Sequence, residues 1–363
     1  MTVEDDFAHF KDVEIPVRRA AYSDRTAWIM ATMAELAYKD FGPDEENNIL
    51  SLAGELATLA NQKEIAERLK ALRVSFRKPR NDKDQILKAV LSAGGFKLAG
   101  KGILYNKDTD TQGFVAVKAA GDEPGMAVIC FRGTKETKDW LTNLDAEPIP
   151  IRSTKPDSDE ILGMMHHGFH EAYKSVEGQI KANLEGHEDL PLFITGHSLG
   201  GALAVIATWY QNSENLAACY TFGAPRVGSI GLIDRFKTPI YRVVNGSDPV
   251  PFAPPSSEVV EFIQTLFELL AKFAPIVGGV ATWLGRFQGY THYGFMRYLS
   301  MVSKGEDGDY PDLRVEYSLS SFGRAFRYYK RILTGQGNRI DKYHNMDRYR
   351  DKLRAHADRR NKK

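Results

Sequence analysis

Cysteine is scarce in this sequence, since Cys130 and Cys219 are the only two among 363 residues. Both stand in apolar runs, AVICF and ACYTF, that are typical of buried strands, so we expect two small core residues and no disulfide framework. An excess of charge of one sign is missing too. The 48 basic and 47 acidic side chains give a formal net charge of +1, which excludes the strong global field of a nucleic-acid-binding protein.

Targeting and membrane-spanning patterns are also absent. The N-terminus, MTVEDDFAHF, is acidic and lacks the cationic segment followed by an apolar one that marks a signal peptide. We therefore expect a cytoplasmic protein, with export by a signal-independent route left open. The uncharged apolar stretch at 273–285 is too short for a membrane span, which needs about 20 residues. We find no internal repeat and no low-complexity tract.

The first third of the chain has helical periodicity. Apolar residues from Trp28 to Ala37 are spaced as one face of a helix, and a second helical stretch, rich in Leu, Ala and Glu, covers 49–72. The polar segment RKPRNDKDQ at 77–85 then separates this part from a strand-rich one. We expect residues 1–95 to form a helical N-terminal layer packed on the main domain.

From residue 96 on, short β-like runs alternate with amphipathic helices, which predicts a mostly parallel central sheet covered by helices on both faces. GILYN and GFVAVK flank the polar DTDTQ and predict a hairpin. The runs MAVICF, PLFITG, AACYTF and PIYRVVN predict buried strands. Helices are expected at about 168–182, 199–211 and 230–236.

The run PLFITGHSLGGALA carries the strongest chemical signal. An apolar strand ends at Gly196, and a helix of small residues begins just after Ser198. A serine on such a strand-to-helix turn has strained backbone angles, and the residues two before and two after it must be small to avoid a clash. Gly196 and Gly200 meet this requirement. The pattern predicts that Ser198 is a nucleophile on an α/β-hydrolase fold.

Attack on a carbonyl creates an oxyanion that needs hydrogen-bond donors. In this turn geometry one donor is the backbone N–H of the residue after the nucleophile, Leu199, and the second comes from a loop after an earlier central strand. FRGT at 131–134 follows the strand MAVIC and fits that place. Gly133 permits close backbone approach, and Thr134 offers an N–H and a hydroxyl, although Thr134 could also simply close a turn.

An imidazole must accept the serine proton, and a carboxylate must orient it. Asp248, in the proline-rich loop NGSDPVPFAPP after a predicted strand, is the candidate acid. Three histidines follow it. His356 lies inside a charged helix, whereas His292 in GYTHYGF and His344 just before the last helix both remain candidates, and the place of His344 on a C-terminal loop favours it.

Four segments together resemble the class 3 lipases: FRGT with DWLTNLDA, HHGFHEAY, GHSLGGALA, and FGAPRVGS with NGSDPVP. The resemblance runs from about 102 to 352 and implies an α/β-hydrolase domain over 96–363. It further implies that Ser198, Asp248 and His344 form the triad, with Tyr349 following the base, and that Thr134 serves the oxyanion. The sequence departs from the family at Tyr343, where many members have an acidic residue.

The resemblance implies a serine hydrolase of lipid carboxylic esters, such as a triacylglycerol lipase or an A-type phospholipase, that makes transient contact with a lipid surface. A small-ester or feruloyl-type esterase and a lipid-degrading effector, with the N-terminal region used for delivery or partner binding, are the alternatives. The chemistry requires no cofactor. His166, His167 and His170 could suggest a metal, but packing and hydrogen bonding fit them better. The apolar segment 259–287 is expected to be a cap or lid, or a buried helical hairpin.

Overall fold

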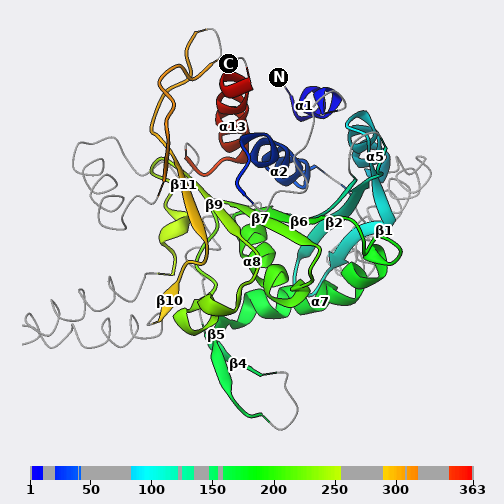
Figure 1. Cartoon of the computed structure of the whole chain (residues 1–363), viewed down its shortest axis with the longest axis vertical. Coiled ribbons are helices and arrows are strands. Elements are labelled where there is room, and N and C mark those ends of the chain that lie inside the picture. Colours follow the sequence, from blue (N-terminus) through cyan, green and yellow to red (C-terminus); the bar gives the residue numbers. More distant parts are fainter. Residues whose placement is uncertain are drawn as a thin grey trace, which may run out of the picture.

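An eight-stranded sheet runs through the part of the chain that the computed structural model describes, namely residues 2–10, 21–39, 41, 83–121, 125–134, 147–153, 158–254, 289–306, 309–317 and 343–361 (Figure 1). Its strand order is β1-β2-β3-β6-β7-β9-β11-β12. The strands are β1 (Phe96–Asn106), β2 (Thr111–Lys118), β3 (Met126–Phe131), β6 (Leu192–His197), β7 (Leu216–Phe222), β9 (Ile240–Asn245), β11 (Phe295–Leu299) and β12 (Val315–Tyr317).

The five central strands from β3 to β11 are parallel, and antiparallel strands complete both edges. Every residue of β3 and β6 is buried, as expected for strands that are covered on both faces. Because side chains alternate between the faces, Val128 and Cys130 of β3 belong to one apolar cluster, and Ala127 and Ile129 to the other. The sheet therefore separates two cores.

Helices cover the two faces. On one face lie α1 (Val3–His9), α2 (Asp24–Leu36), α5 (Lys83–Ala93) and α13 (Met346–Asn361); on the other lie α7 (His167–Leu184) and α8 (Leu199–Gln211) (Figure 1). Helix α8 connects β6 to β7 and packs against both. Chain segments from the N-terminus and the C-terminus thus form one layer together, because α2 packs against α13 as well as the sheet.

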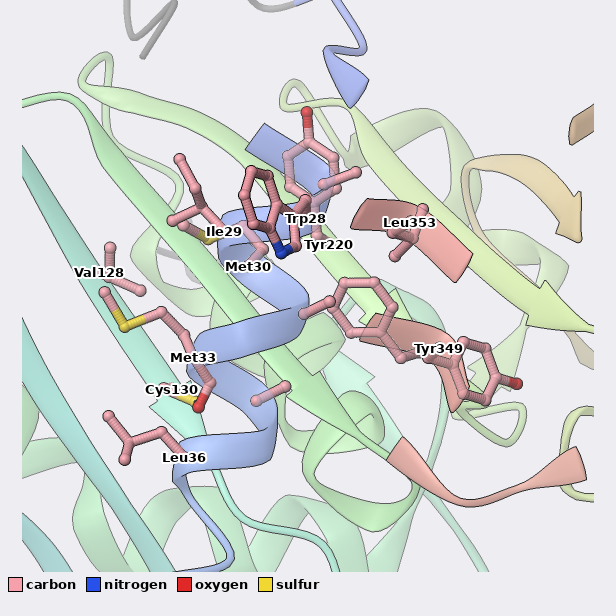
Figure 2. Close-up of a cluster of buried hydrophobic side chains, with 14 of the residues drawn as sticks. Trp28, Ile29, Met30, Met33, Leu36, Val128, Cys130, Tyr220, Tyr349 and Leu353 are labelled. Atoms are coloured by element: carbon pink, nitrogen blue, oxygen red, sulfur yellow. The ribbon is translucent and has the colours of Figure 1, made fainter. Parts of the chain in front are cut away.

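Helix α2 differs from the one-sided helix that its sequence predicts. It is buried almost all round: Ala27, Ile29 and Ala31 are as inaccessible as the expected apolar face. Figure 2 shows Val128 and Cys130 of the sheet on one side of α2, and Tyr349 and Leu353 of α13 on the other. The prediction of a single apolar face is wrong here because the helix has apolar partners on two opposite sides.

A smaller antiparallel sheet, in the order β10-β8-β5-β4, lies beside the main one and was not expected from the sequence. Its strands are β4 (Pro148–Arg152), β5 (Ile161–His166), β8 (Gly228–Ser229) and β10 (Tyr290–Thr291). Two short 3-10 helices, η1 (Ile230–Arg235) and η2 (Val250–Phe252), complete the described elements. Strands of two residues leave too little pattern to be recognised.

Most predicted elements of the main sheet are confirmed. The hairpin is β1 and β2, the four buried runs are β3, β6, β7 and β9, and the expected helices are α7, α8 and η1. The prediction that the polar segment at 77–85 separates the helical part from the strand-rich part is partly wrong, because α5 begins inside this segment at Lys83. The helix expected at 49–72 and the cap or lid expected at 259–287 lie outside the described residues. None of the described helices is both long and apolar enough to cross a membrane.

Candidate active site

Ser198 occupies the turn between β6 and α8. Its φ of 57° and ψ of −127° put a non-glycine residue at positive φ, which costs on the order of 1–3 kcal/mol and persists only where surrounding contacts enforce it. One such contact is the Ser198 N–H, which donates to the carbonyl of Phe222 at 2.9 Å. The side chain is 1% exposed. The strained serine turn that the sequence predicts is present.

The flanking glycines fit the close approach of the backbone at this turn. A Cβ on Gly196 would overlap the carbonyl of Gly200, and a Cβ on Gly200 would overlap the carbonyl of Phe131 at the end of β3. The obstacles are backbone atoms, which cannot turn aside as a side chain can. Both glycines therefore allow α8 to begin directly against β3 and the loop that follows it.

Asp248 lies in the turn after β9 and is fully buried. Its Oδ1 accepts the backbone N–H of Val250 at 2.9 Å. Its Oδ2 accepts the Tyr349 hydroxyl at 2.5 Å and lies 2.8 Å from Nδ1 of His344. A buried carboxylate is costly unless such donors surround it. The sequence-predicted acid and base therefore meet, although 96 positions separate them in the chain.

The contact with Asp248 sets the protonation of the His344 ring. An ionised carboxylate can only accept, so Nδ1 of His344 donates, and in the neutral ring Nε2 carries the lone pair. This Nε2 atom and the Oγ of Ser198 are both buried and have no hydrogen-bond partner among the described residues. A proton acceptor and a hydroxyl are thus left available, and the ring of His197, the residue before Ser198, lies with its centroid 4.4 Å from that of His344.

The loop that carries His344 is held by a buried lysine. Asn245, at the end of β9, donates from Nδ2 to the carbonyl of Tyr343 at 2.9 Å. Lys352 donates to Oδ1 of Asn245 and to the carbonyl of Ser300, both at 2.8 Å. Burial lowers the pKa of Lys352 to about 8. Sequence reasoning missed both residues, because a lysine in a charged helix gives no sign that it points inward.

The predicted oxyanion loop reaches the serine from the end of β3. A Cβ on Gly133 would overlap the Tyr38 hydroxyl and would lie 3.1 Å from Cβ of Ser198. Leu199 is the first residue of α8, so its N–H has no partner within the helix. Thr134 and His344 line one pocket of about 350 Å³, together with Glu35, Tyr38, His197, Asn345, Met346 and Asp347.

Glu35, on the wall of this pocket, belongs to a charged cluster between α2 and α13. Its Oε1 lies 3.3 Å from the Arg350 guanidinium. The pKa of Glu35 is raised to about 7, chiefly by burial; Arg350 opposes this rise, and the nearby acids Asp347, Asp351 and Asp6 add to it. Glu35 is thus an acid that titrates near neutral pH, on a helix whose sequence gives no sign of it.

The other histidines have different partners. His292 bonds the carbonyl of Pro251 at 2.7 Å, and His356 lies 3.5 Å from Asp24, so neither contacts Asp248 through the bonds that the structure records. His166 accepts the N–H of Phe169 at the start of α7, and His170 bonds the Tyr210 hydroxyl at 2.8 Å. Within the described ranges, no group of three or more His, Cys, Asp or Glu residues is arranged to hold a metal ion.

The central part of this chain is similar to one family of known proteins. The family model described as lipase (class 3) matches residues 128–258. The chain is 32% identical to a secreted mono- and diacylglycerol lipase from Fusarium solani over 42% of its own length and 46% of that protein. It is also 32% identical to a lipase from Rhizomucor miehei, over 39% of this chain and 41% of the relative. The chain therefore spans less than half the length of these relatives.

Solved structures give a partial likeness. A Rhizomucor miehei lipase in complex with its propeptide superposes on 64% of this chain and 63% of its own, with 24% identity and a TM-score of 0.44. The parallel strand order and the turn at Ser198, rather than this superposition, define the α/β-hydrolase fold of the described residues.

The expectation of a cytoplasmic location is wrong. The finding that contradicts it is the similarity to the Fusarium solani lipase, which is named as secreted. The two cysteines could not decide this question, because Cys130 and Cys219 are fully buried thiols and burial raises the pKa of both. A protonated thiol inside a core is protected from oxidation in either compartment. Residues 128–258 are thus similar to the lipase (class 3) family.

Proposed function

We propose that this protein hydrolyses carboxylic esters of lipids, with Ser198, His344 and Asp248 as its catalytic residues. The Ser198 hydroxyl gives its proton to Nε2 of His344 as its oxygen attacks the ester carbonyl, and Asp248 stabilises the resulting imidazolium. Collapse of the tetrahedral intermediate breaks the bond to the alcohol, which leaves with the proton from His344. Water then attacks the acyl-enzyme by the same route and releases the fatty acid.

The oxyanion of both tetrahedral intermediates would be bound by the backbone N–H of Leu199 and by the N–H and hydroxyl of Thr134. The positive end of α8 adds to this stabilisation, because Leu199 is its first residue. Each fixed donor at such a position is typically worth about 3–4 kcal/mol in the transition state. The closeness of the Gly133 backbone to Ser198 supports this assignment.

One observation carries the proposal. The Ser198 turn, Asp248 and the loop after β3 follow the carboxyl ends of the parallel strands β6, β9 and β3, and His344 comes from the segment before α13. Parallel strands bring their carboxyl ends to one edge of the sheet, where α/β proteins bind ligands. A buried hydroxyl and a buried imidazole lone pair with no partner among the described residues are unfavourable in a purely structural site.

The substrate that we infer is an acylglycerol or a phospholipid acyl ester, met at a lipid surface outside the cell. This inference is based on the activities for which similar proteins are named. They include the Fusarium solani mono- and diacylglycerol lipase and a phospholipase A1 of rice that is 26% identical over 40% of this chain. We also infer that residues 1–95 form a helical layer of a hydrolase domain at 96–363, which the burial of α2 between the sheet and α13 supports.

Hydrolysis rates across p-nitrophenyl esters of increasing acyl length, and on phosphatidylcholine vesicles, test the proposal. A lipid esterase should prefer the longer acyl chains presented as aggregates, whereas a small-ester esterase should prefer short soluble ones. Ser198→Ala should abolish turnover on every substrate and should prevent covalent labelling by a fluorophosphonate. Turnover that survives in Ser198→Ala would refute the mechanism.

A further inference from the structure

Tyr38 brings the N-terminal helical layer into contact with the candidate site. It lies in the turn directly after α2, and its hydroxyl oxygen is 2.7 Å from Nδ1 of His197, the neighbour of Ser198. The two rings also meet edge to face, with centroids 5.7 Å apart. Residues 159 positions apart in the chain thus share a hydrogen bond beside the nucleophile.

The protonation of His197 follows from its other contact. Its Nε2 lies 2.6 Å from the backbone carbonyl of His344, and a carbonyl can only accept, so Nε2 carries the proton. Nδ1 must therefore accept, and the Tyr38 hydroxyl donates to it. Burial and the neighbouring His344 hold the pKa of His197 well below its usual range, which keeps the ring neutral with one donor and one acceptor.

Tyr38 also contacts the loop predicted to bind the oxyanion. Gly133 lies directly against Tyr38, because a Cβ at residue 133 would overlap the Tyr38 hydroxyl. Burial raises the pKa of Tyr38 far above its usual value, so the phenol stays protonated and keeps its donor. Direct contacts therefore run from Gly133 to Tyr38, and two hydrogen bonds continue through His197 to the backbone of His344.

We propose that Tyr38 and His197 are positioning residues. They fix the loop after β3, which contains Gly133, and the segment before α13, which carries His344, relative to each other across the nucleophile turn. This inference rests on the proposed function. Neither residue is assigned a proton transfer: the two side chains hold backbone atoms of Gly133 and His344. Misplacing a catalytic group by about 1 Å can cost on the order of 100-fold in rate, so a link of this kind acts on kcat.

Tyr38→Phe tests the link, because it removes one oxygen and keeps the ring. We expect kcat for a short soluble ester to fall about 10- to 100-fold with KM nearly unchanged. Tyr22→Phe is the matched control: Tyr22 precedes the same helix and packs on Tyr220 and Tyr241, away from the pocket. That control should keep the wild-type kcat.

A double-mutant cycle and NMR distinguish positioning from general loss of packing. If Tyr38 and His197 act as one unit, Tyr38→Phe combined with His197→Gln should be no slower than the worse single variant. In ¹⁵N-histidine spectra, wild-type His197 should be the neutral Nε2–H tautomer, and its Nδ1 resonance should shift in Tyr38→Phe. The shift does not depend on activity or on the folding yield of other variants.

The outcomes separate this inference from the function on which it rests. Wild-type kcat in Tyr38→Phe, additive rate losses in the cycle, or an Nδ1-protonated His197 would each overturn the positioning role while loss of activity in Ser198→Ala still supports the esterase. Hydrolysis that survives in Ser198→Ala would overturn both.

Discussion

Glu35→Gln offers a quantitative test of the charged cluster between α2 and α13. The wild-type side chain is 20% exposed and pairs with Arg350, yet burial raises its pKa from 4.5 to about 7. A carboxyl whose pKa is higher in the folded state favours folding at low pH, and this advantage is lost as pH rises from 4.5 through about 7. Glutamine keeps the shape and cannot titrate.

The size of the effect follows from the shift. One pKa unit corresponds to about 1.4 kcal/mol, and the part of the shift that titrates between pH 5 and pH 8 amounts to about 2 to 3 kcal/mol for Glu35. The free energy of unfolding of Glu35→Gln minus that of wild type should therefore be higher by about 2 to 3 kcal/mol at pH 8 than at pH 5. This change is positive because wild type acquires a buried negative charge as Glu35 loses its proton, whereas the glutamine variant does not.

Urea unfolding followed by circular dichroism at pH 5, 6, 7 and 8 measures this difference. Glu160→Gln is a suitable control for the substitution itself, because its side chain is 55% exposed and pairs with Arg235 at the surface, where an ion pair contributes little to stability. A Glu35→Gln difference that changes by less than about 1 kcal/mol across this range would refute the buried-acid reasoning.

Contacts around the triad give further measurable expectations. Tyr349→Phe removes the donor to Asp248 and the acceptor for the buried Asn245 N–H, so the free energy of unfolding should fall by about 1–3 kcal/mol; an unchanged urea midpoint would contradict this. Asp248→Asn should lower kcat by about 10³- to 10⁴-fold, because an amide that donates favours the wrong imidazole tautomer; the stopped assay of a soluble ester measures it. Gly200→Ala would press a Cβ onto the Phe131 carbonyl and should cost about 1–3 kcal/mol of stability, so a wild-type unfolding curve would argue against this packing.

The nucleophile turn and the main sheet could be predicted because their signals are local. Strand β6 is a short apolar run, α8 begins with small residues, and the glycines at 196 and 200 stand where backbone atoms leave no room for a Cβ. The hairpin of β1 and β2 was equally plain, since a polar turn joins two apolar runs. Each of these features depends on residues that are close to one another in the sequence.

The choice of base was less secure from sequence. His292 and His344 both follow Asp248 in an aromatic or polar loop, and nothing in either segment states which ring lies beside the carboxylate. The packing of α13 decides which histidine contacts the carboxylate. Tyr349 on that helix donates to Asp248, and Lys352 donates to Asn245, which in turn bonds the backbone next to His344. The position of the base therefore depends on contacts made across about 100 residues of chain.

What the sequence determined by itself was the chemistry: a strained serine on a glycine turn, a carboxylate after a strand and a limited choice of imidazoles, each specified by short-range pattern. Only the tertiary structure decided which histidine meets Asp248, that α2 is buried on opposite sides, and that Tyr38 and Glu35 of the N-terminal layer reach the pocket. The physical reason is that turns and strands are encoded by neighbours in sequence, whereas burial, pKa and hydrogen-bond partners depend on the elements that the folded sheet brings together.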